Sequence, residues 1–299
     1  MYALPALTCL GLSLLLLQAK PKAPTNPESL RPQIAEAIDS LEVITVDKPK
    51  KVLIFSVTKG YRHRSIPTGK LAFKMLGERT GAFEAVISDD LSNFEPENID
   101  QFGAICFLNT TNEVFSPHSK RKKVKLTPEE EQEWTAREAR LKESMMRFIK
   151  SGKGFIGIHA ATDTFYQWPE YGEMIGAYFA GHPWTQGTLV HVNAPNPNNK
   201  LISYLNGESL ELKEEIYQYK SPLNEESADV ILKLDPHKNS FAKAIRPEEK
   251  NNPVSWTKAH GNGRVFYSCF GHNDHVYYHP KILQHYLNGI QWALGDSSL

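Results

Sequence analysis

The stretch at residues 152–165, GKGFIGIHAATDTF, decides the fold. Its apolar run at 155–158 is bounded by glycines and predicts a short buried strand that ends in a tight turn. In an open α/β sheet, ligands bind outside the carboxyl ends of the strands, so His159 is expected at a site. Ala160 and Ala161 are small enough to let the turn pass close to the sheet. The pattern is that of a nucleophile elbow with an imidazole in place of Ser or Cys. The alternative is a histidine that only caps the strand.

Other apolar runs surround this strand and alternate with helical patterns. KVLIFSV at 51–57 is unbroken, which is typical of a parallel strand covered on both faces. A helix opened by Ser65 and Pro67 follows it, and a second helix is expected between the capping box at 127–130 and Gly152. Further strands are predicted at residues 83–88 and 104–108. This alternation predicts an α/β fold with a doubly wound, mainly parallel sheet.

The second half of the chain predicts antiparallel additions to that sheet. Residues 212–219 alternate enough to form one strand that carries Glu215 and Tyr217, and a loop before it holds His182. A last helix is expected at residues 280–294. The remaining strands of this half are predicted at residues 188–193, 229–234, 254–258 and 264–270.

Four separated motifs resemble the ThuA-like (trehalose utilisation) family. They are VTKGYRHRSIP at 57–67, GFIGIHAATD at 154–163, EEIYQYK at 214–220 and GRVFYSCFGHNDHV at 263–276. The resemblance covers about residues 50–295. That family belongs to the class I glutamine amidotransferase-like superfamily, so the resemblance implies a flavodoxin-like fold and a role in the catabolism of sugars and keto-glycosides.

Cysteine use argues against glutaminase chemistry. A glutamine amidotransferase of this superfamily needs a nucleophilic cysteine at the elbow. Cys106 and Cys269 lie instead in apolar, strand-like stretches, where a buried and inert thiol is expected. We therefore expect no Cys-dependent glutamine amidotransferase activity.

The amino terminus predicts export. Residues 10–17, LGLSLLLL, form an apolar run that is too short to span a bilayer and matches the core of a signal peptide. We expect cleavage after Ala19 and a secreted or periplasmic protein without stable membrane insertion. Residues 1–19 are then a signal peptide, 20–49 an amino-terminal extension and 50–295 the ThuA-like domain.

Charge and motifs limit the partners. The 299 residues hold 34 Lys and Arg against 34 Asp and Glu, so no net field recruits nucleic acid. The basic run at 120–125 is expected to be an exposed loop before a helix. The chain has no P-loop, so no nucleotide cofactor is predicted. The expected partner is a small sugar or glycoside, and an oligomer is compatible with the sequence.

Polar residues at strand ends supply the candidate site, because such positions converge on one cleft in this fold. Histidine beside a carboxylate suits acid–base chemistry near neutral pH. The candidate catalytic residues are His159, Asp163, Glu215 and His272. The candidate substrate-binding residues are His63, Asn109, Thr110, His182, Tyr217 and Trp184.

The same set suggests a divalent metal, although no HExxH or HxH spacing fixes one. Several histidines with a carboxylate suit Zn²⁺ with an open coordination position. The candidate ligands are His159, His182, His272 and Glu215. The other reading of each histidine is structural or exposed, and we adopt it for His118, His237, His260 and His285. Aromatic residues after the elbow could stack on a sugar or simply pack: Tyr166, Trp168, Tyr178, Phe179 and Trp184.

Two classes of function follow. The first is an enzyme that acts on a glycoside or keto-sugar by hydrolysis, elimination or isomerisation, with metal assistance as an option. A 3-keto group acidifies the proton at C2, so a base can act without a covalent nucleophile. The second class is a non-catalytic sugar-binding or structural module on the same fold. An enzyme requires His159 and its partners within hydrogen-bond reach, whereas a binding module requires only shape and stacking.

Overall fold

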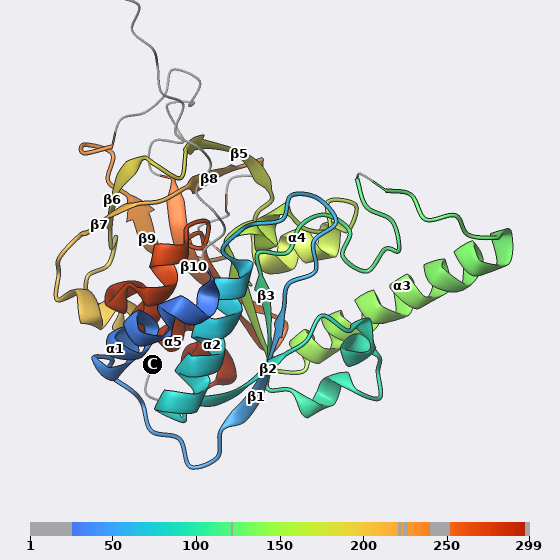
Figure 1. Ribbon diagram of the computed structural model, residues 1–299, viewed down its shortest axis with the longest axis horizontal. Helices are drawn as coiled ribbons and strands as arrows, with labels where there is room; N and C mark the ends of the chain where they lie inside the picture. Colours follow the sequence, from blue (N-terminus) through green and yellow to red (C-terminus); the bar gives the residue numbers. More distant parts are fainter. Residues whose placement is uncertain (1–25, 121, 221–222, 224–226, 240–251, 297–299) are drawn as a thin grey trace, which may run out of the picture.

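A nine-stranded mixed sheet forms the centre of the molecule (Figure 1). The computed structural model describes residues 26–120, 122–220, 223, 227–239 and 252–296. The strand order is β2-β1-β3-β4-β11-β10-β9-β6-β7, and a separate two-stranded sheet pairs β5 with β8. The strands are β1 (Lys50–Phe55), β2 (Phe83–Ile87), β3 (Ala104–Leu108), β4 (Gly154–Ile158), β5 (Phe179–Trp184), β6 (Leu189–Asn193), β7 (Leu210–Lys213), β8 (Ile216–Tyr219), β9 (Asp229–Leu234), β10 (Pro253–His260) and β11 (Gly263–Ser268).

The first half of the sheet is parallel. Strands β2, β1, β3, β4 and β11 are all joined by parallel pairing. This arrangement follows the flavodoxin-like order of doubly wound sheets, in which ligands bind at the carboxyl edge. Every residue of β3 and β4 is buried, as the apolar runs predict for strands covered on both faces. The predicted fold class and the placement of these strands in one sheet are confirmed.

The second half of the sheet is antiparallel, from β11 through β10, β9 and β6 to β7. The predicted single strand at 212–219 is wrong, because the chain breaks into β7 and β8, which belong to different sheets. Glu214 and Glu215 lie at this break, and both carboxylates are buried. His182 lies in β5 rather than in the predicted loop, and β5 pairs with β8 in an irregular register.

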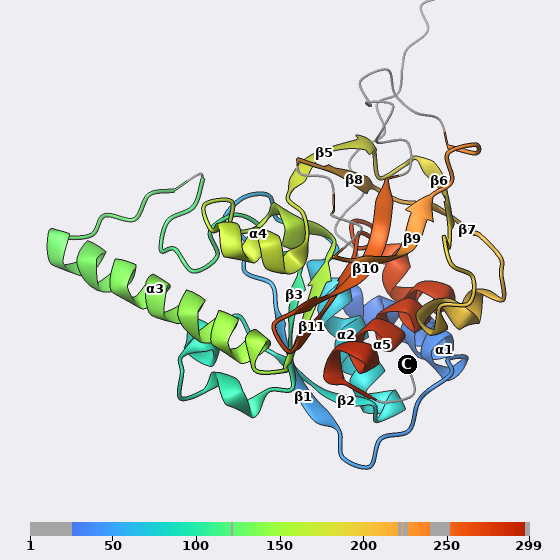
Figure 2. The ribbon, with the colours of Figure 1, turned by 180° about the vertical axis from the view of Figure 1, so that it is seen from behind.

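Helices cover both faces of the sheet. On one face lie α1 (Arg31–Asp39), α2 (Ile66–Thr80) and α5 (Pro280–Leu294), and on the other lie α3 (Pro128–Lys150) and α4 (Pro169–Ile175), as Figures 1 and 2 show. Helix α3 begins at the predicted capping box, in which Thr127 and Glu130 each bond the other's backbone N–H. Helix α1 packs against α2 and α5, where Ile34 and Ile38 join the core.

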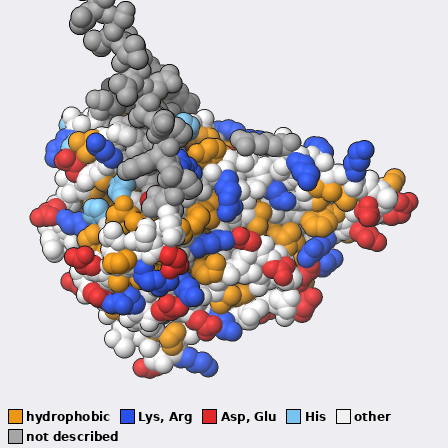
Figure 3. All heavy atoms as spheres, viewed as in Figure 1, with side chains coloured by type: hydrophobic (Ala, Val, Ile, Leu, Met, Phe, Trp, Pro, Cys, Tyr) orange, Lys and Arg blue, Asp and Glu red, His pale blue; other side chains and the backbone are white. Residues whose placement is uncertain are grey.

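Surface charge and helix character bear on the predicted partners and on membrane insertion. Basic and acidic side chains are interspersed over the face drawn in Figure 3. Among the helices that the structure describes, none combines the length and the apolar character needed to cross a membrane. The predicted signal peptide at residues 1–19 lies outside the described residues.

One buried ion-pair network ties α3 to the segment after β2. The Glu95 side chain is only 10% exposed, and its two oxygens accept from Arg137 Nε at 2.9 Å and Arg140 Nε at 2.8 Å. The hydrogen bond from Arg140, together with Arg137 and against the effect of burial, holds the pKa of Glu95 below its usual value. A depressed pKa in the folded state means that the carboxylate stabilises the fold above its unfolded-state pKa and loses this effect as pH falls.

We predict that Glu95→Gln lowers the free energy of unfolding by about 2 kcal/mol at pH 7, the usual loss for a hydrogen bond to a charged group. The difference from wild type should shrink as pH falls through the range below about 4.5, because both proteins then carry a neutral side chain there. Urea unfolding at pH 7 and pH 3.5, with the exposed Glu36→Gln as control, measures it. An equal difference at both pH values would contradict the assignment.

Candidate functional site

The turn after β4 is a tight elbow with His159 at its apex. His159 has a φ of +50°, in the left-handed region that a non-glycine residue seldom occupies. The residues on either side of the turn must be small, because a Cβ added at Gly157 would lie only 3.2 Å from the Ala161 Cβ. The backbone of Gly271 passes so close that a Cβ there would lie 2.8 Å from the His159 Cβ. The elbow therefore requires these small neighbours, and strained backbones of this kind cluster at functional sites in proteins.

The buried His159 ring has a fixed tautomer. Its Nδ1 lies 2.7 Å from the carbonyl oxygen of Cys269, so Nδ1–H donates to that oxygen and Nε2 is left without a proton in the neutral ring. Nε2 lies 3.5 Å from Oε1 of Glu215 and has no hydrogen-bond partner among the described residues. The Tyr217 ring covers the imidazole at a centroid distance of 4.2 Å.

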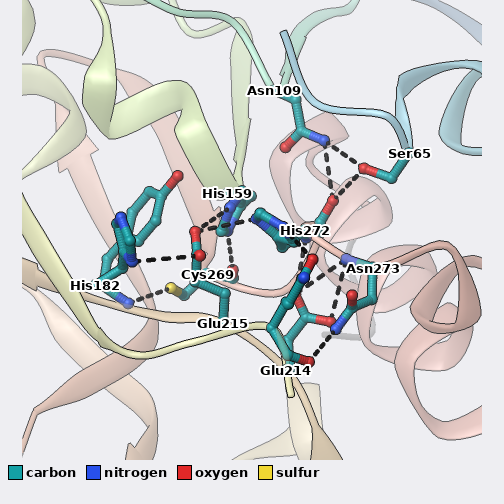
Figure 4. Close-up of polar contacts among 12 residues, drawn as sticks. Ser65, Asn109, His159, His182, Glu214, Glu215, Cys269, His272 and Asn273 are labelled. Carbon is teal, nitrogen blue, oxygen red and sulfur yellow. Dashed lines mark hydrogen bonds and ion pairs between the residues drawn. The ribbon is translucent and has the colours of Figure 1, made fainter. Parts of the chain in front are cut away.

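His272 and His63 complete a group of three imidazoles (Figure 4 shows His159, His272 and Glu215). His272 Nε2–H donates a hydrogen bond to Gln186 Oε1 at 3.2 Å, and its Nδ1 faces Glu215 Oε1 at 3.0 Å. His63 is 4% exposed, and its ring lies edge-on to His159 and His272 at centroid distances of 4.8 and 5.2 Å. Its Nδ1 is buried and lacks a partner within the described part of the chain.

The carboxylate of Glu215 dominates the electrostatics of this group. Although burial opposes ionisation, the imidazoles of His159 and His272 hold the pKa of Glu215 well below its usual range. Burial and the neighbouring histidines lower the pKa of His63 to about 2, and burial lowers the pKa of His159. The nearby carboxylate raises the pKa of His272 against the effect of burial. Burial therefore favours the neutral forms of His63 and His159, whereas the contacts with the histidines favour the ionised form of Glu215.

These four side chains fit a metal ion. His63, His159, Glu215 and His272 each offer one ligand atom, and these atoms all lie within 4.8 Å of one another. Neutral imidazole nitrogens and a carboxylate oxygen are a donor set that Zn²⁺ accepts. The Cys269 carbonyl and Gln186 amide hold the outer N–H groups of His159 and His272, as second-shell acceptors do around metal-binding histidines. Buried nitrogens without partners cost free energy, which a bound cation would offset.

The metal candidates differ from the sequence-based set in one position. His63 belongs to the four-residue group, whereas His182 does not. His182 lies on β5 with its side chain 52% exposed, and its Nδ1 lies 3.5 Å from the other Glu215 oxygen, Oε2. Strand β5 thus places His182 at the mouth of the site, and the loop after β1 brings His63 into its interior.

A pocket of about 460 Å³ is lined by three of the four residues, His63, Glu215 and His272. The fully buried His159, which the sequence predicts in the same cleft, does not line it. Asp163, His182 and Tyr217 line it, as predicted, and Asp163 accepts a hydrogen bond of 2.6 Å from the Tyr166 hydroxyl. Phe179 adds an apolar wall. Sequence reasoning missed three lining residues, Tyr61, Thr185 and Gln186, although Tyr61 lies inside one of the family motifs.

Three predicted substrate-binding residues do not line this pocket. Asn109 Nδ2 donates to the Gly271 carbonyl at 2.9 Å and lies 3.1 Å from the Ser65 hydroxyl, so it ties together the loops after β1, β3 and β11. The Thr110 hydroxyl is buried against the Thr164 hydroxyl at 2.9 Å. Trp184 is 1% exposed and belongs to the core. The structure gives these side chains contacts within the protein instead of a place at the pocket.

Glu214 supports the site from behind, and sequence reasoning missed it. Its buried carboxylate accepts from the backbone N–H of His272 at 2.8 Å and of Asn273 at 3.3 Å (Figure 4). Burial raises the pKa of Glu214 to about 7. The paired glutamates of the motif EEIYQYK therefore act in opposite directions, one into the pocket and one onto the loop that carries His272.

The four histidines taken as structural or exposed lie outside the group of potential ligands. His285 is fully buried beside the Ser255 hydroxyl at 3.0 Å, and burial lowers the pKa of His285 to about 3. His118 Nδ1 accepts the backbone N–H of Val124 at 3.2 Å. The others are the buried His260 and the exposed His237.

We predict that Gly271→Ala destabilises the fold by about 2 kcal/mol more than Gly152→Ala. Both glycines have positive φ, +146° and +112°, but only at Gly271 does a Cβ collide with the elbow, while at Gly152 its nearest contact is 3.8 Å. Overpacking of this kind costs about 1–3 kcal/mol. Chemical unfolding of the two variants decides the point. Equal losses would show that the elbow tolerates the extra methyl group.

Comparison with known proteins agrees with this architecture. The family model described as ThuA, trehalose utilisation, matches residues 51–293. A putative ThuA-like protein from Bacteroides uniformis has a TM-score of 0.63 at 20% identity, covering 87% of this chain and 97% of its own. One from Parabacteroides merdae has a TM-score of 0.56 at 17% identity, covering 84% and 92%. No curated protein sequence matches significantly. The chain is thus a member of the ThuA (trehalose utilisation) family.

Proposed function

We propose that this protein is an enzyme of carbohydrate catabolism that acts on a glycoside or keto-sugar at a divalent metal centre. His63, His159, Glu215 and His272 would hold the ion. One observation carries the proposal: buried imidazole nitrogens that have no hydrogen-bond partner in the described part of the chain converge on one carboxylate. Such a cluster costs stability unless a ligand satisfies it, so a purely structural role leaves it unexplained.

The donor set indicates what a bound ion would contribute. A cation such as Zn²⁺, when bound, polarises a carbonyl or hydroxyl oxygen of the substrate. The chain contributes the rest. Glu215 reaches the cluster through Oε1 and His182 through Oε2. The same carboxylate therefore couples the buried histidines to the exposed one at the pocket mouth.

His182 is the residue best placed to move a proton. It lines the pocket, its side chain is half exposed, and Glu215 orients it through Nδ1 at 3.5 Å. Histidine is the commonest general acid–base residue of enzymes. In a keto-sugar the carbon beside the carbonyl loses its proton readily, and His182 would accept that proton and return it to the leaving oxygen or to the neighbouring carbon. Elimination and isomerisation then need no covalent nucleophile, which suits an elbow that carries His159.

The pocket also has the walls that a sugar ring requires. Tyr61, Phe179 and Tyr217 line it beside the polar groups. Apolar walls with a few convergent polar groups are typical of small-molecule sites. A non-catalytic sugar-binding module would use the same walls, but it would have no need of the buried histidine cluster.

We predict that the protein, loaded with Zn²⁺ and dialysed, retains about one ion per chain, and that His159→Gln or His272→Gln weakens zinc affinity by more than a hundredfold. Loss of an outer partner of a ligand costs 10–100-fold, and loss of a ligand should cost more. Elemental analysis and competition with a chelating dye measure this. His260→Gln is the matched control, because it removes a histidine outside the cluster. Equal zinc retention by wild type and both ligand variants would refute the metal centre.

We predict a different outcome for His182→Gln, which should keep the metal but lower turnover of keto-disaccharides by about 10²–10⁴-fold, the usual contribution of a general acid–base residue. Release of product from a panel of 3-keto-disaccharides and their parent sugars is the measurement. Unchanged turnover would remove His182 from the mechanism. Binding of sugars by wild type without any turnover would favour the binding module.

A further inference from the structure

His272 differs from His159 in the kind of acceptor that holds the outer nitrogen of its ring. The side chain of His159 is fully buried, and its Nδ1–H donates to a backbone carbonyl, that of Cys269, at 2.7 Å. The side chain of His272 is 14% exposed, and its Nε2–H donates to a side chain, the Oε1 atom of the exposed Gln186, at 3.2 Å. The orientation of the His272 ring therefore depends on the identity of residue 186.

The turn that carries Gln186 is fixed by contacts of its backbone. Residues 185–188 connect β5 to β6, and a hydrogen bond of 2.8 Å joins the first and last residues of this turn. The Thr188 carbonyl accepts the backbone N–H of Glu214 at 3.1 Å. The Gln186 carbonyl accepts from Nδ2 of Asn273 at 2.9 Å. Because these bonds do not involve the Gln186 side chain, that side chain can be replaced while the turn keeps its position.

The same contacts close a ring of hydrogen bonds around His272. The Glu214 carboxylate accepts the backbone N–H groups of His272 at 2.8 Å and of Asn273 at 3.3 Å (Figure 4). The Asn273 side chain leads back to the turn, and the Gln186 side chain reaches the imidazole. The backbone and the imidazole of His272 are thus fixed by connected neighbours. Outer hydrogen bonds of this kind orient the ligands of metal sites and fix their tautomers.

The Gln186 contact favours the ring orientation that serves the cluster. In this orientation, His272 Nδ1 faces Glu215 Oε1 at 3.0 Å. The last torsion of a histidine side chain has two broad minima related by about 180°. Rotation of the ring by that angle would exchange Nδ1 with Cδ2 and Nε2 with Cε1, so carbon atoms would face both Glu215 and Gln186. The rotated ring would lose its hydrogen bond to Gln186 and would also withdraw Nδ1 from the cluster.

We propose that Gln186 is a positioning residue of the metal centre, which holds the His272 ring with Nδ1 inward and keeps a hydrogen on Nε2. The inference rests on the proposed function, because His272 is a ligand of the proposed centre. Gln186 lies outside the four family motifs, so the motif positions alone do not identify it. Gln186 and His272 both line the pocket, and their contact joins the centre to the space in which a substrate would bind.

Three variants of the full chain separate this role from a general structural one. Gln186→Met removes the acceptor at nearly the same side-chain length, whereas Gln186→Glu keeps an acceptor oxygen. Gln132→Met is the matched control, because Gln132 is exposed on α3 and lies outside the pocket. In competition with a chelating dye, Gln186→Met should bind zinc about 10–100-fold more weakly than wild type, the usual loss for an outer partner of a ligand. Gln186→Glu and Gln132→Met should bind zinc at least as tightly as wild type.

Proton and nitrogen NMR spectra of the zinc-loaded proteins give a second readout. The Nε2–H proton of His272 should be detected in wild type and in Gln186→Glu, and it should be lost to exchange with water in Gln186→Met. The Nδ1–H proton of His159 is the internal reference and should persist in all four proteins, because its acceptor is a buried carbonyl.

The outcomes distinguish the positioning role from the metal centre itself. Zinc affinity in Gln186→Met equal to that of wild type, or an equal loss in Gln186→Met and Gln186→Glu, would overturn the positioning role alone. Failure of wild type to retain zinc would overturn the metal centre, and the proposed function with it.

Discussion

The sharp turn at His159 is the constraint on which the rest of the site depends. Strand β4 ends in the centre of the sheet, and the chain must leave it within one residue, which forces His159 into a left-handed backbone. This conformation brings the imidazole over the carboxyl edge, where Gly271 passes against its Cβ. His272 is the next residue after Gly271 in the loop that follows β11. A wider turn would separate the two histidines that share Glu215.

The buried residues of the site lower the stability of the fold. Burial of His63, His159 and Glu215 costs desolvation, and the unpartnered ring nitrogens add to it. The surrounding structure offsets these costs with hydrogen-bonded groups, such as the Asn109 amide nitrogen and the Glu214 carboxylate. Natural proteins depart from local consistency mainly at functional positions. Among the described residues, unpartnered ring nitrogens of His63, His159 and His272 converge on Glu215 at the carboxyl edge of the sheet, and this convergence is the physical basis for proposing function there.

The parallel half of the fold was predictable because its strands are short, apolar and covered on both faces, so the sequence pattern has one interpretation. The break between β7 and β8 was not, since LKEEIYQY alternates like a single strand and only packing reveals that both glutamates turn inward. Similarly, a loop histidine such as His63 gives no local sign of whether it enters the site or only borders it. Side chains that close loops, such as Asn109, look the same in sequence as those that bind ligands. Strand-end position identifies the neighbourhood, and the tertiary contacts assign the roles.

The central claim is that His63, His159 and His272 form a metal centre together with Glu215. X-ray absorption at the zinc edge of the zinc-loaded protein tests it most directly, because it reports the atoms bound to the ion. The account predicts a first shell of three imidazole nitrogens at about 2.0–2.1 Å and a carboxylate oxygen at a similar distance, without sulfur. The imidazole signal should fall by about one third in His63→Gln. A shell of oxygen atoms only, or a spectrum unchanged by His63→Gln, would contradict it.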